Sequence, residues 1–250
     1  MRRTLGFGVL LGLVSLLLLD AVLARSGLAP LLPRAEGAGP WMLSRSAAFT
    51  AYVALSLEIA LGLLVSTGAA DRWIARARFV ELHQWLSSAT LVLVGAHVLS
   101  LLGDGFAGLD ALDLGVPFLA PLRRVATGLG VLSGYLLLAL HVSYGMRGRI
   151  GARTWRKLHY ASFALYVLAT VHGISAGTDT GRPFATTLYA VSAAVVTALV
   201  AARIASAQQK QTALRAASAP PTLSHGPGIV RGPWVQPTPH DTTEPRRTSP

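Results

Sequence analysis

Residues 80–102 read VELHQWLSSATLVLVGAHVLSLL, an apolar run that contains two histidines, His83 and His97. A helix of about 20 apolar residues is long enough to cross the hydrocarbon core of a bilayer. This run is that long and carries a single acidic residue, Glu81. We therefore expect a membrane-spanning helix here. Histidines at such a depth are costly unless they face a partner, a cavity or a cofactor.

Similar apolar runs occur on both sides of this one. Together they predict six membrane-spanning helices, over residues 5–24, 47–66, 80–102, 125–146, 158–177 and 185–202. Hydrophobic residues make up 52% of the 250 residues and charged residues only 13%, which is typical of a membrane protein. The expected fold is all-α, a polytopic bundle of about six transmembrane helices in residues 1–204.

The two ends of the chain differ from this bundle. Met1-Arg2-Arg3, the apolar run after it and Val22-Leu23-Ala24 also fit a secretory signal with a cleavage site, although the run is long for a signal core. From residue 205 onward the sequence gains Gln, Ser, Thr and Pro and loses its apolar period. Residues 205–250 are therefore predicted to form a disordered cytoplasmic tail. His225 and His240 lie in this tail and are assigned no role.

Basic residues gather in alternate loops, and this pattern predicts the orientation of the chain. Lys and Arg concentrate in cytoplasmic loops of membrane proteins. The loops after the second and fourth spans are basic, with Arg72, Arg76 and Arg78 in one and Arg147, Arg149, Arg153, Arg156 and Lys157 in the other. The loop after the third span instead carries Asp104, Asp110 and Asp113. We expect a multi-pass protein of the cell membrane with both termini in the cytoplasm.

We therefore attribute the net charge of +11 to the basic residues that mark cytoplasmic loops and tails. The expected partner is membrane lipid and not nucleic acid. Arg25, Arg34 and Arg45 in the first outer loop depart from the charge rule.

Cysteine is absent, which excludes disulfides, iron–sulfur clusters and covalent c-type heme attachment. Any metal chemistry must therefore use histidine and carboxylate ligands.

The third and fifth spans each carry two histidines. His83 and His97 are 14 residues apart, and His159 and His172 are 13 apart. At a rise of about 1.5 Å per residue, these spacings correspond to roughly 21 and 20 Å along two helices that run in the same direction. The spacing predicts two facing pairs, one near each membrane surface. Two neutral imidazoles on opposing helices are able to fill both axial positions of a heme iron, which predicts two b-type hemes. For any single histidine, a hydrogen bond between helices is the alternative.

The angular positions of the histidines agree less well with this pairing. At about 100° per residue, a 14-residue spacing leaves two side chains within roughly 40° of one face, but a 13-residue spacing leaves them about 140° apart. The fifth span therefore needs a local tightening, for example near Gly173, or the two heme planes must be rotated differently.

Two segments resemble one family of membrane heme proteins. Thr154-Trp155-Arg156-Lys157-Leu158-His159-Tyr160 with His172, and Glu81-Leu82-His83-Gln84-Trp85 with His97, resemble the fifth and third helices of ferric reductase-like transmembrane domains. This family includes NADPH oxidases, ferric-chelate reductases and the YedZ-like heme subunits of a bacterial methionine sulfoxide reductase system. The resemblance covers roughly residues 41–202. It implies two bis-histidine b hemes, places the ligand role on the four histidines, and implies that the 13-residue spacing is tolerated.

The chain departs from the longer members of that family. After the sixth span we find no flavin or nicotinamide domain, and no G-x-G-x-x-G follows a plausible strand. We therefore expect an oxidoreductase component that depends on an external electron donor, a flavoprotein or a quinone. Its acceptor is expected outside, either a ferric chelate or a partner oxidoreductase of the methionine sulfoxide reductase type. In the latter case the chain is a dedicated heme subunit. A transporter or scaffold without cofactor is the remaining alternative.

Several other residues are secondary candidates. His141, in the fourth span, is an alternative ligand or a partner for a heme propionate, or a helix hydrogen-bonding group. Arg123, Arg124 and Arg182 near the outer surface, and Arg156 near the inner one, are candidates for pairing with propionates. Glu58, in the second span, is either a neutral hydrogen-bonded acid or part of a proton route. The acidic outer loop is a weaker candidate for attracting a metal substrate.

Overall fold

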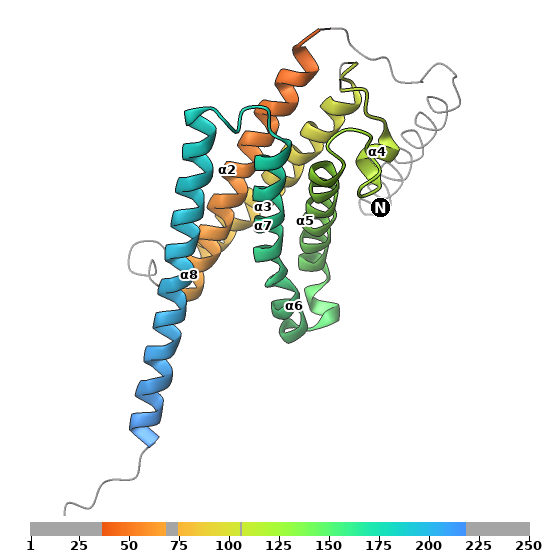
Figure 1. Cartoon of the computed structure of the whole chain (residues 1–250). Helices are drawn as coiled ribbons and strands as arrows, with labels where there is room; N and C mark the ends of the chain where they lie inside the picture. Colours follow the sequence, from red (N-terminus) through yellow and green to blue (C-terminus); the bar gives the residue numbers. More distant parts are fainter. Residues whose placement is uncertain (1–36, 69–74, 106, 219–250) are drawn as a thin grey trace, which may run out of the picture. The chain divides into compact units, whose positions relative to one another are not determined.

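The computed structural model describes residues 37–68, 75–105 and 107–218. Regular structure in these ranges is helical, without a β-strand: α2 (Gly39–Thr67), α3 (Arg76–Leu102), α4 (Ala111–Gly115), α5 (Arg124–Ile150), α6 (Ala152–His159), α7 (Ala161–Ala176) and α8 (Pro183–Ser218) (Figure 1). The predicted first span, over 5–24, and the part of the predicted tail after residue 218 lie outside the described residues.

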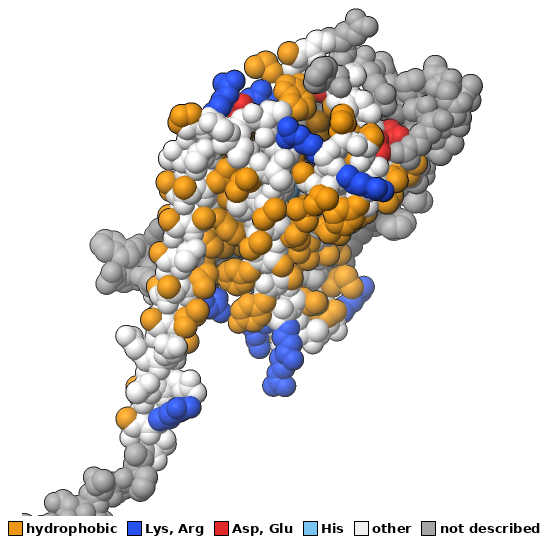
Figure 2. All heavy atoms as spheres, in the orientation of Figure 1, with side chains coloured by type: hydrophobic (Ala, Val, Ile, Leu, Met, Phe, Trp, Pro, Cys, Tyr) orange, Lys and Arg blue, Asp and Glu red, His pale blue; other side chains and the backbone are white. Residues whose placement is uncertain are grey.

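Four helices, α2, α3, α5 and α8, are long and apolar enough to cross a membrane. They contain the predicted spans over 47–66, 80–102, 125–146 and 185–202. The expected all-α membrane helix bundle is confirmed. Orange apolar side chains cover much of the side of the bundle in Figure 2. Exposed apolar residues include Val167 of α7 and Val195 of α8. Such a surface is suited to lipid rather than to water.

The predicted fifth span is divided at Tyr160, which ends α6 and precedes α7. The Tyr160 amide donates to the Lys157 carbonyl at 3.3 Å, and the Phe163 amide donates to the Tyr160 carbonyl at 3.2 Å. Bonds between residues three apart are those of a 3₁₀ turn, which is wound more tightly than an α-helix. The local tightening that the histidine spacing required therefore lies at Tyr160. Gly173 lies within the regular helix α7.

Helix α8 corrects the predicted start of the tail. It continues to Ser218, so residues 205–218 are helical and not disordered. This segment contains neither Pro nor Gly and consists mostly of Ala, Gln, Lys, Arg and Leu, which are strong helix formers. The high helix propensity of these residues keeps the segment helical although its apolar periodicity has been lost. The chain from Gln209 onward forms a separate unit, and the bundle described below ends at Gln208.

Four helices form a ring in which each packs against two neighbours. Helix α2 packs against α3, α3 against α5, α5 against α7, and α7 against α2. This order places α3 and α7 at diagonal positions. The buried core joins apolar residues of α2, α5, α7 and α8, including Leu63, Leu137, Leu165 and Val196. Side chains of α3 and α7 that point inward therefore meet across the middle of the ring.

Hydroxyl groups connect α8 and α7 to α2 inside the apolar core. Tyr166 and Ser192 share a hydrogen bond of 2.6 Å, and the Ser192 hydroxyl donates to Ser56 at 2.8 Å. Tyr52 lies 3.1 Å from Thr170 and donates to Ser192 at 3.3 Å. Each hydrogen bond between membrane helices contributes modestly, about 0.6 kcal/mol on average. The cluster therefore determines the position of α8 against α2 and α7 more than it contributes to the free energy of their packing.

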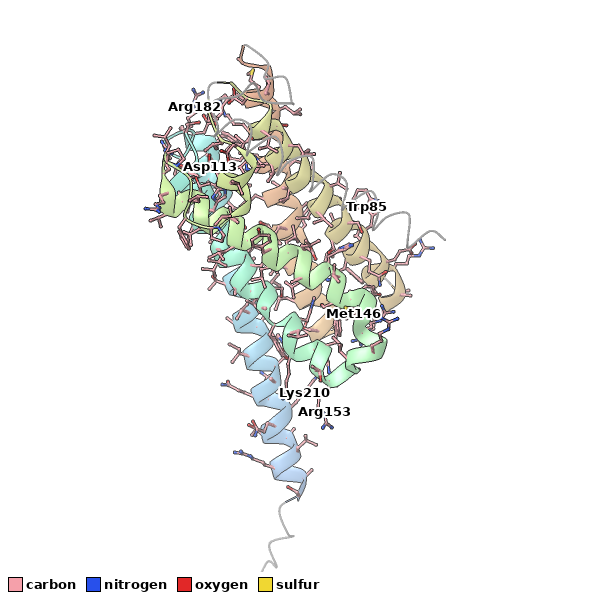
Figure 3. The ribbon with its side chains drawn as sticks, turned by 90° about the vertical axis from the view of Figure 1, so that its right-hand side faces the viewer. Trp85, Asp113, Met146, Arg153, Arg182 and Lys210 are labelled. Carbon is pink, nitrogen blue, oxygen red and sulfur yellow. The ribbon has the colours of Figure 1, made fainter. Side chains whose placement is uncertain are left out.

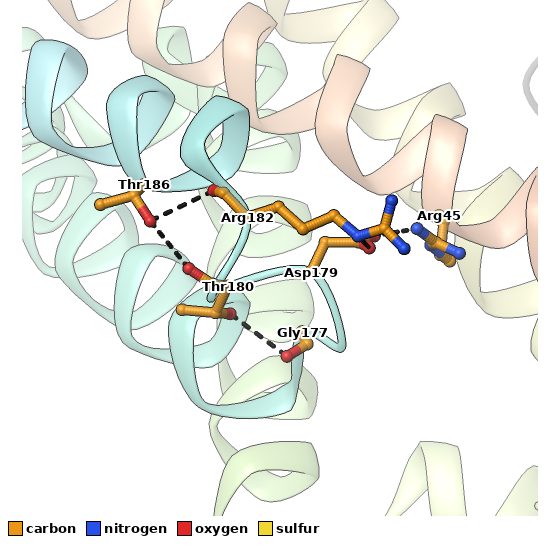
Figure 4. A network of polar contacts seen from close by, with 6 residues as sticks. All are labelled: Arg45, Gly177, Asp179, Thr180, Arg182 and Thr186. Carbon is orange, nitrogen blue, oxygen red and sulfur yellow. Dashed lines mark hydrogen bonds and ion pairs between the residues drawn. The ribbon is translucent and has the colours of Figure 1, made fainter.

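The loop between α7 and α8 is fastened to the start of α2 by a buried acid (Figure 4). Asp179 is 4% exposed and forms ion pairs with Arg45 of α2 and with Arg182 of its own loop. Thr180 donates to the Gly177 carbonyl at 3.2 Å, and Thr186 donates to the Thr180 carbonyl at 2.8 Å. These contacts fix the end of α7 that carries His172.

Replacing Asp179 by Asn should lower the free energy of unfolding by about 1–3 kcal/mol, because a buried site built for a carboxylate loses its charge-assisted bonds. The measurement is unfolding in SDS followed by circular dichroism. The control is Arg182→Ala. That side chain is 73% exposed, and its loss should cost less than about 1 kcal/mol. Equal stability of Asp179→Asn and the parent protein would contradict this account.

Candidate functional site

Four of the five histidines in the predicted spans meet as two pairs across the ring. His83 of α3 faces His159 of α6, with ring centres 6.0 Å apart and ring planes at 76°. His97 of α3 faces His172 of α7, with ring centres 6.4 Å apart and planes at 67°. The structure thus brings together the residues that the spacing paired. The backbones of α3 and α7 make little direct contact, so the imidazoles span the space between them.

Helix geometry explains how unequal spacings reach equal levels. His97 lies beside Ser44 and His83 beside Glu58, so the two histidines of α3 are aligned along α2 with a 14-residue spacing on both helices. A 3₁₀ turn rises about 2.0 Å per residue, compared with about 1.5 Å in an α-helix. Three residues in such a turn add roughly 1.5 Å, the rise of one helical residue. The turn at Tyr160 therefore lengthens the 13-residue spacing to match the 14-residue one.

Backbone carbonyls of the neighbouring helices hold three of the four rings through Nδ1. The distances are 3.1 Å from His83 Nδ1 to the Glu58 carbonyl, 3.0 Å from His97 Nδ1 to the Ser44 carbonyl, and 2.8 Å from His172 Nδ1 to the Ala126 carbonyl. A carbonyl oxygen only accepts hydrogen bonds, so these contacts favour the tautomer in which Nδ1 carries the proton. The Ser44 hydroxyl also lies 2.8 Å from His97 Nδ1. In the neutral ring Nε2 is then left with its lone pair, which is the arrangement of a metal-binding histidine.

His159 is held by aromatic contacts instead. Its ring stacks on Trp155, with centres 5.0 Å apart and planes at 24°. Trp155 in turn packs edge-on against Tyr144 of α5 at 5.9 Å, and Gln84 of α3 donates a hydrogen bond to the Tyr144 hydroxyl. The contacts among α3, α5 and α6 therefore orient this ring without a carbonyl partner. The indole Nε1 of Trp155 is buried and has no hydrogen-bond partner among the described residues.

Two glycines lie against the imidazoles, and one of them, Gly130, is needed to make room. A Cβ atom at Gly130 would lie 2.6 Å from His172 Cε1 and 2.7 Å from its Nδ1, a distance that real side chains do not adopt. A Cβ at Gly62 would lie 3.5 Å from His83 Cε1, which is ordinary contact. Gly130 therefore allows α5 to approach close enough for the Ala126 carbonyl to hold His172. Sequence reasoning missed Gly130, Trp155 and the carbonyl partners, because pairing of distant segments is not visible in a single sequence.

The ring separations distinguish a metal-bridged pair from a hydrogen-bonded pair. A direct hydrogen bond of about 2.9 Å between two imidazoles would bring the ring centres to roughly 5 Å. Two imidazoles on opposite sides of one iron, with metal–nitrogen bonds of about 2 Å, have centres roughly 6 Å apart. The observed 6.0 and 6.4 Å match the second arrangement. In the tautomer that the carbonyl contacts of His97 and His172 favour, both Nδ1 atoms are donors and both Nε2 atoms are acceptors, which excludes a direct bond between the two Nε2 atoms.

The donor set fits heme better than a bare ion. Each level offers two imidazoles, and among the described residues no three His, Cys, Asp or Glu side chains come together as an ion site. Heme iron receives four ligands from its own porphyrin and needs only two from the protein. The residues present therefore fit two bis-histidine b hemes.

The secondary candidates lie apart from the imidazole pairs. His141 is half-buried on α5 and belongs to neither pair, whereas Arg156 is exposed on α6. Arg123 donates to the Ala176 carbonyl at 2.7 Å, and thus caps the carboxyl end of α7. Arg124 donates to the Phe118 carbonyl. A propionate role for these arginines stays a prediction.

Three acidic candidates also have defined positions. Asp110 accepts from the Asp113 amide at 3.0 Å, and Asp113 accepts from the Asp110 amide at 3.1 Å, so the two form a capping box for α4. This is a structural use of both carboxylates. Glu58 Oε1 lies 4.0 Å from His83 Nε2, beyond hydrogen-bond distance.

The chain was compared with protein-family models, curated proteins and solved structures. Neither a protein-family model nor a curated protein nor a solved structure matches it. The resemblance to ferric reductase-like domains therefore stays a hypothesis based on the quoted segments, and the argument for function depends on the geometry of the histidines.

Replacing Gly130 by Ala should force His172 away from α5, because the added methyl group would overlap the ring. The expected loss is about 1–3 kcal/mol of unfolding free energy, typical of overpacking. Gly134→Ala, one turn further along α5, is the matched control, since nothing lies within 4 Å of a Cβ atom there. It should be neutral or stabilising by up to about 1 kcal/mol. Equal stability of the two variants in SDS unfolding would contradict the proposed close approach.

Proposed function

We propose that this protein carries electrons across a membrane through two b-type hemes, one held by His83 and His159 and the other by His97 and His172. The observation that carries the proposal is the pair of ring separations, 6.0 and 6.4 Å. They are too long for hydrogen bonds between the rings and match imidazoles that share one iron. A transporter or scaffold without cofactor would give no reason for two imidazole pairs at these separations inside an apolar bundle.

The protein's own residues support this function by positioning and by excluding water. Heme, when bound, supplies a reversible one-electron change between ferric and ferrous iron. The carbonyls of Ser44, Glu58 and Ala126 fix the tautomer of three ligands and raise the basicity of Nε2. Along α3 the two levels are about 21 Å apart, a large part of the roughly 30 Å hydrocarbon core. An electron that passes from one level to the other crosses most of the barrier.

The donor and acceptor follow from the same proposal. We place the basic loops on the cytoplasmic side of a cell membrane, where a flavoprotein or a quinone supplies electrons to the His83 and His159 level. The outer level passes them to a ferric chelate or to an extracytoplasmic partner oxidoreductase. The protein is then an oxidoreductase component of the ferric reductase-like type. No activity of its own is assigned beyond electron transfer.

The test of this function is heme content. Purified protein should give two b hemes per chain in a pyridine hemochrome assay, and the double variant His97→Ala/His172→Ala should give one. His141→Ala is the control and should retain both. A folded parent protein without heme, or a double variant with undiminished heme, would contradict the ligand assignment.

A further inference from the structure

Ser44 contacts His97 with both its backbone and its side chain. Its carbonyl oxygen lies 3.0 Å from His97 Nδ1, and its hydroxyl oxygen lies 2.8 Å from the same nitrogen. The hydroxyl also donates to the His97 backbone carbonyl at 3.3 Å. Ser44 is only 2% exposed, so bulk water does not compete for these contacts. The two residues thus form a closed hydrogen-bonded pair between α2 and α3.

One assignment of the protons satisfies all three contacts. The hydroxyl has a single proton, which the His97 carbonyl accepts, so a hydroxyl lone pair faces Nδ1. The Ser44 carbonyl, which has no proton to donate, faces the same nitrogen. Nδ1 therefore carries a proton that two acceptors of Ser44 share. If the hydroxyl donated to Nδ1 instead, the ring nitrogen and the carbonyl oxygen would face each other as two acceptors at 3.0 Å.

The hydroxyl of Ser44 is directed differently from several other serine hydroxyls of the long helices. Four of these donate to the carbonyl four residues earlier in their own helix, namely those of Ser56, Ser88, Ser100 and Ser133. Such a bond is common for a serine within a helix. The Ser44 hydroxyl instead bonds to a residue of the neighbouring helix, at the imidazole of a proposed heme ligand.

The four proposed heme ligands differ in the acceptors that face Nδ1. His97 has two, the carbonyl and the hydroxyl of Ser44, whereas His83 and His172 have one carbonyl each. The ring of His159 stacks on an indole instead. An acceptor at Nδ1 makes the other ring nitrogen a stronger electron donor to a metal. His97 is therefore the most electron-rich of the four ligands.

This contact lies at the end of the bundle that we place outside. Arg45, which follows Ser44, pairs with Asp179 in the loop that also contains Arg182. Figure 3 shows Arg182 and Arg153 at opposite ends of the bundle. In the proposed function the outer heme passes electrons to the acceptor, so its reduction potential determines which acceptors receive them.

We propose that the Ser44 hydroxyl lowers the reduction potential of the heme held by His97 and His172. This inference rests on the proposed function and names a residue that regulates the same site. A ligand that donates more electron density stabilises ferric iron more than ferrous iron, because ferric iron carries the larger positive charge. Reduction adds one electron to the iron, and the proton stays on Nδ1. Ser44 thus acts through His97 as a positioning residue and makes the outer heme a stronger reductant.

The test is a redox titration of the full-length, heme-loaded protein in nanodiscs, followed by absorbance and fitted with one component per heme. The component that is missing from His97→Ala/His172→Ala is the outer heme. Ser44→Ala should raise the equilibrium constant for reduction of the outer heme by about three- to tenfold, because the ligand loses one hydrogen bond. A tenfold change corresponds to about 59 mV for one electron. The inner heme should change by less than about twofold, since it is distant.

Ser100→Ala is the matched control. Ser100 lies one turn from His97 on α3, and its hydroxyl donates to the Ala96 carbonyl at 2.6 Å. Its loss should change the equilibrium constant of either heme by less than about twofold. Ser44→Cys has nearly the shape of the parent side chain but a weaker acceptor. It should shift the outer heme in the same direction as Ser44→Ala by less, and it gives the answer if Ser44→Ala loses that heme.

The contrary outcomes are distinct. An outer heme whose potential is unchanged or lowered in both Ser44 variants overturns the inference, and a fall would show that the hydroxyl donates to the ring. An equal shift of both hemes, or the same shift in Ser100→Ala, also overturns it. Loss of the outer heme from both Ser44 variants assigns the hydroxyl to heme retention and not to tuning. Parent protein that folds without heme overturns the proposed function itself.

Discussion

The hydrogen bonds from three imidazole Nδ1 atoms to backbone carbonyls are the constraint on which the rest of the structure depends. The carbonyls of Glu58 and Ser44 belong to α2, and that of Ala126 belongs to α5. Each bond favours one tautomer and orients a ring that faces a histidine of the diagonal segment. Two acceptors cannot bond to each other, and the separations of 6.0 and 6.4 Å leave room for the heme iron that we propose between the facing rings. The helix order, the glycine at position 130 and the turn at Tyr160 all serve this arrangement.

The structure separates two tasks between adjacent and diagonal helices. The diagonal helices α3 and α7, with α6, carry the imidazoles, while the adjacent helices α2 and α5 supply the groups that orient them. At the His172 level this support is rigid, because Gly130 allows close approach and Arg123 caps α7. At the His159 level it consists of aromatic packing on a short basic helix. One level is therefore held mainly by backbone groups and the other by aromatic side chains.

The sequence predicted the spans and the pairs of histidines because both depend on local pattern and on the rise of a helix. Apolar length identified α2, α3, α5 and α8, and the spacings of 14 and 13 residues paired His83 with His159 and His97 with His172. It missed Ser44, Gly130 and Trp155, whose importance appears only when distant helices are adjacent. It also ended α8 too early, because periodicity was lost while helix propensity remained.

Electron paramagnetic resonance of the oxidised, purified protein tests the central claim most directly, since it reports the axial ligands of each iron and the angle between their planes. The ring planes at 76° and 67° predict two low-spin ferric signals of the strongly anisotropic type that near-perpendicular imidazoles produce. High-spin signals, or signals from a single iron in fully loaded protein, would contradict the account.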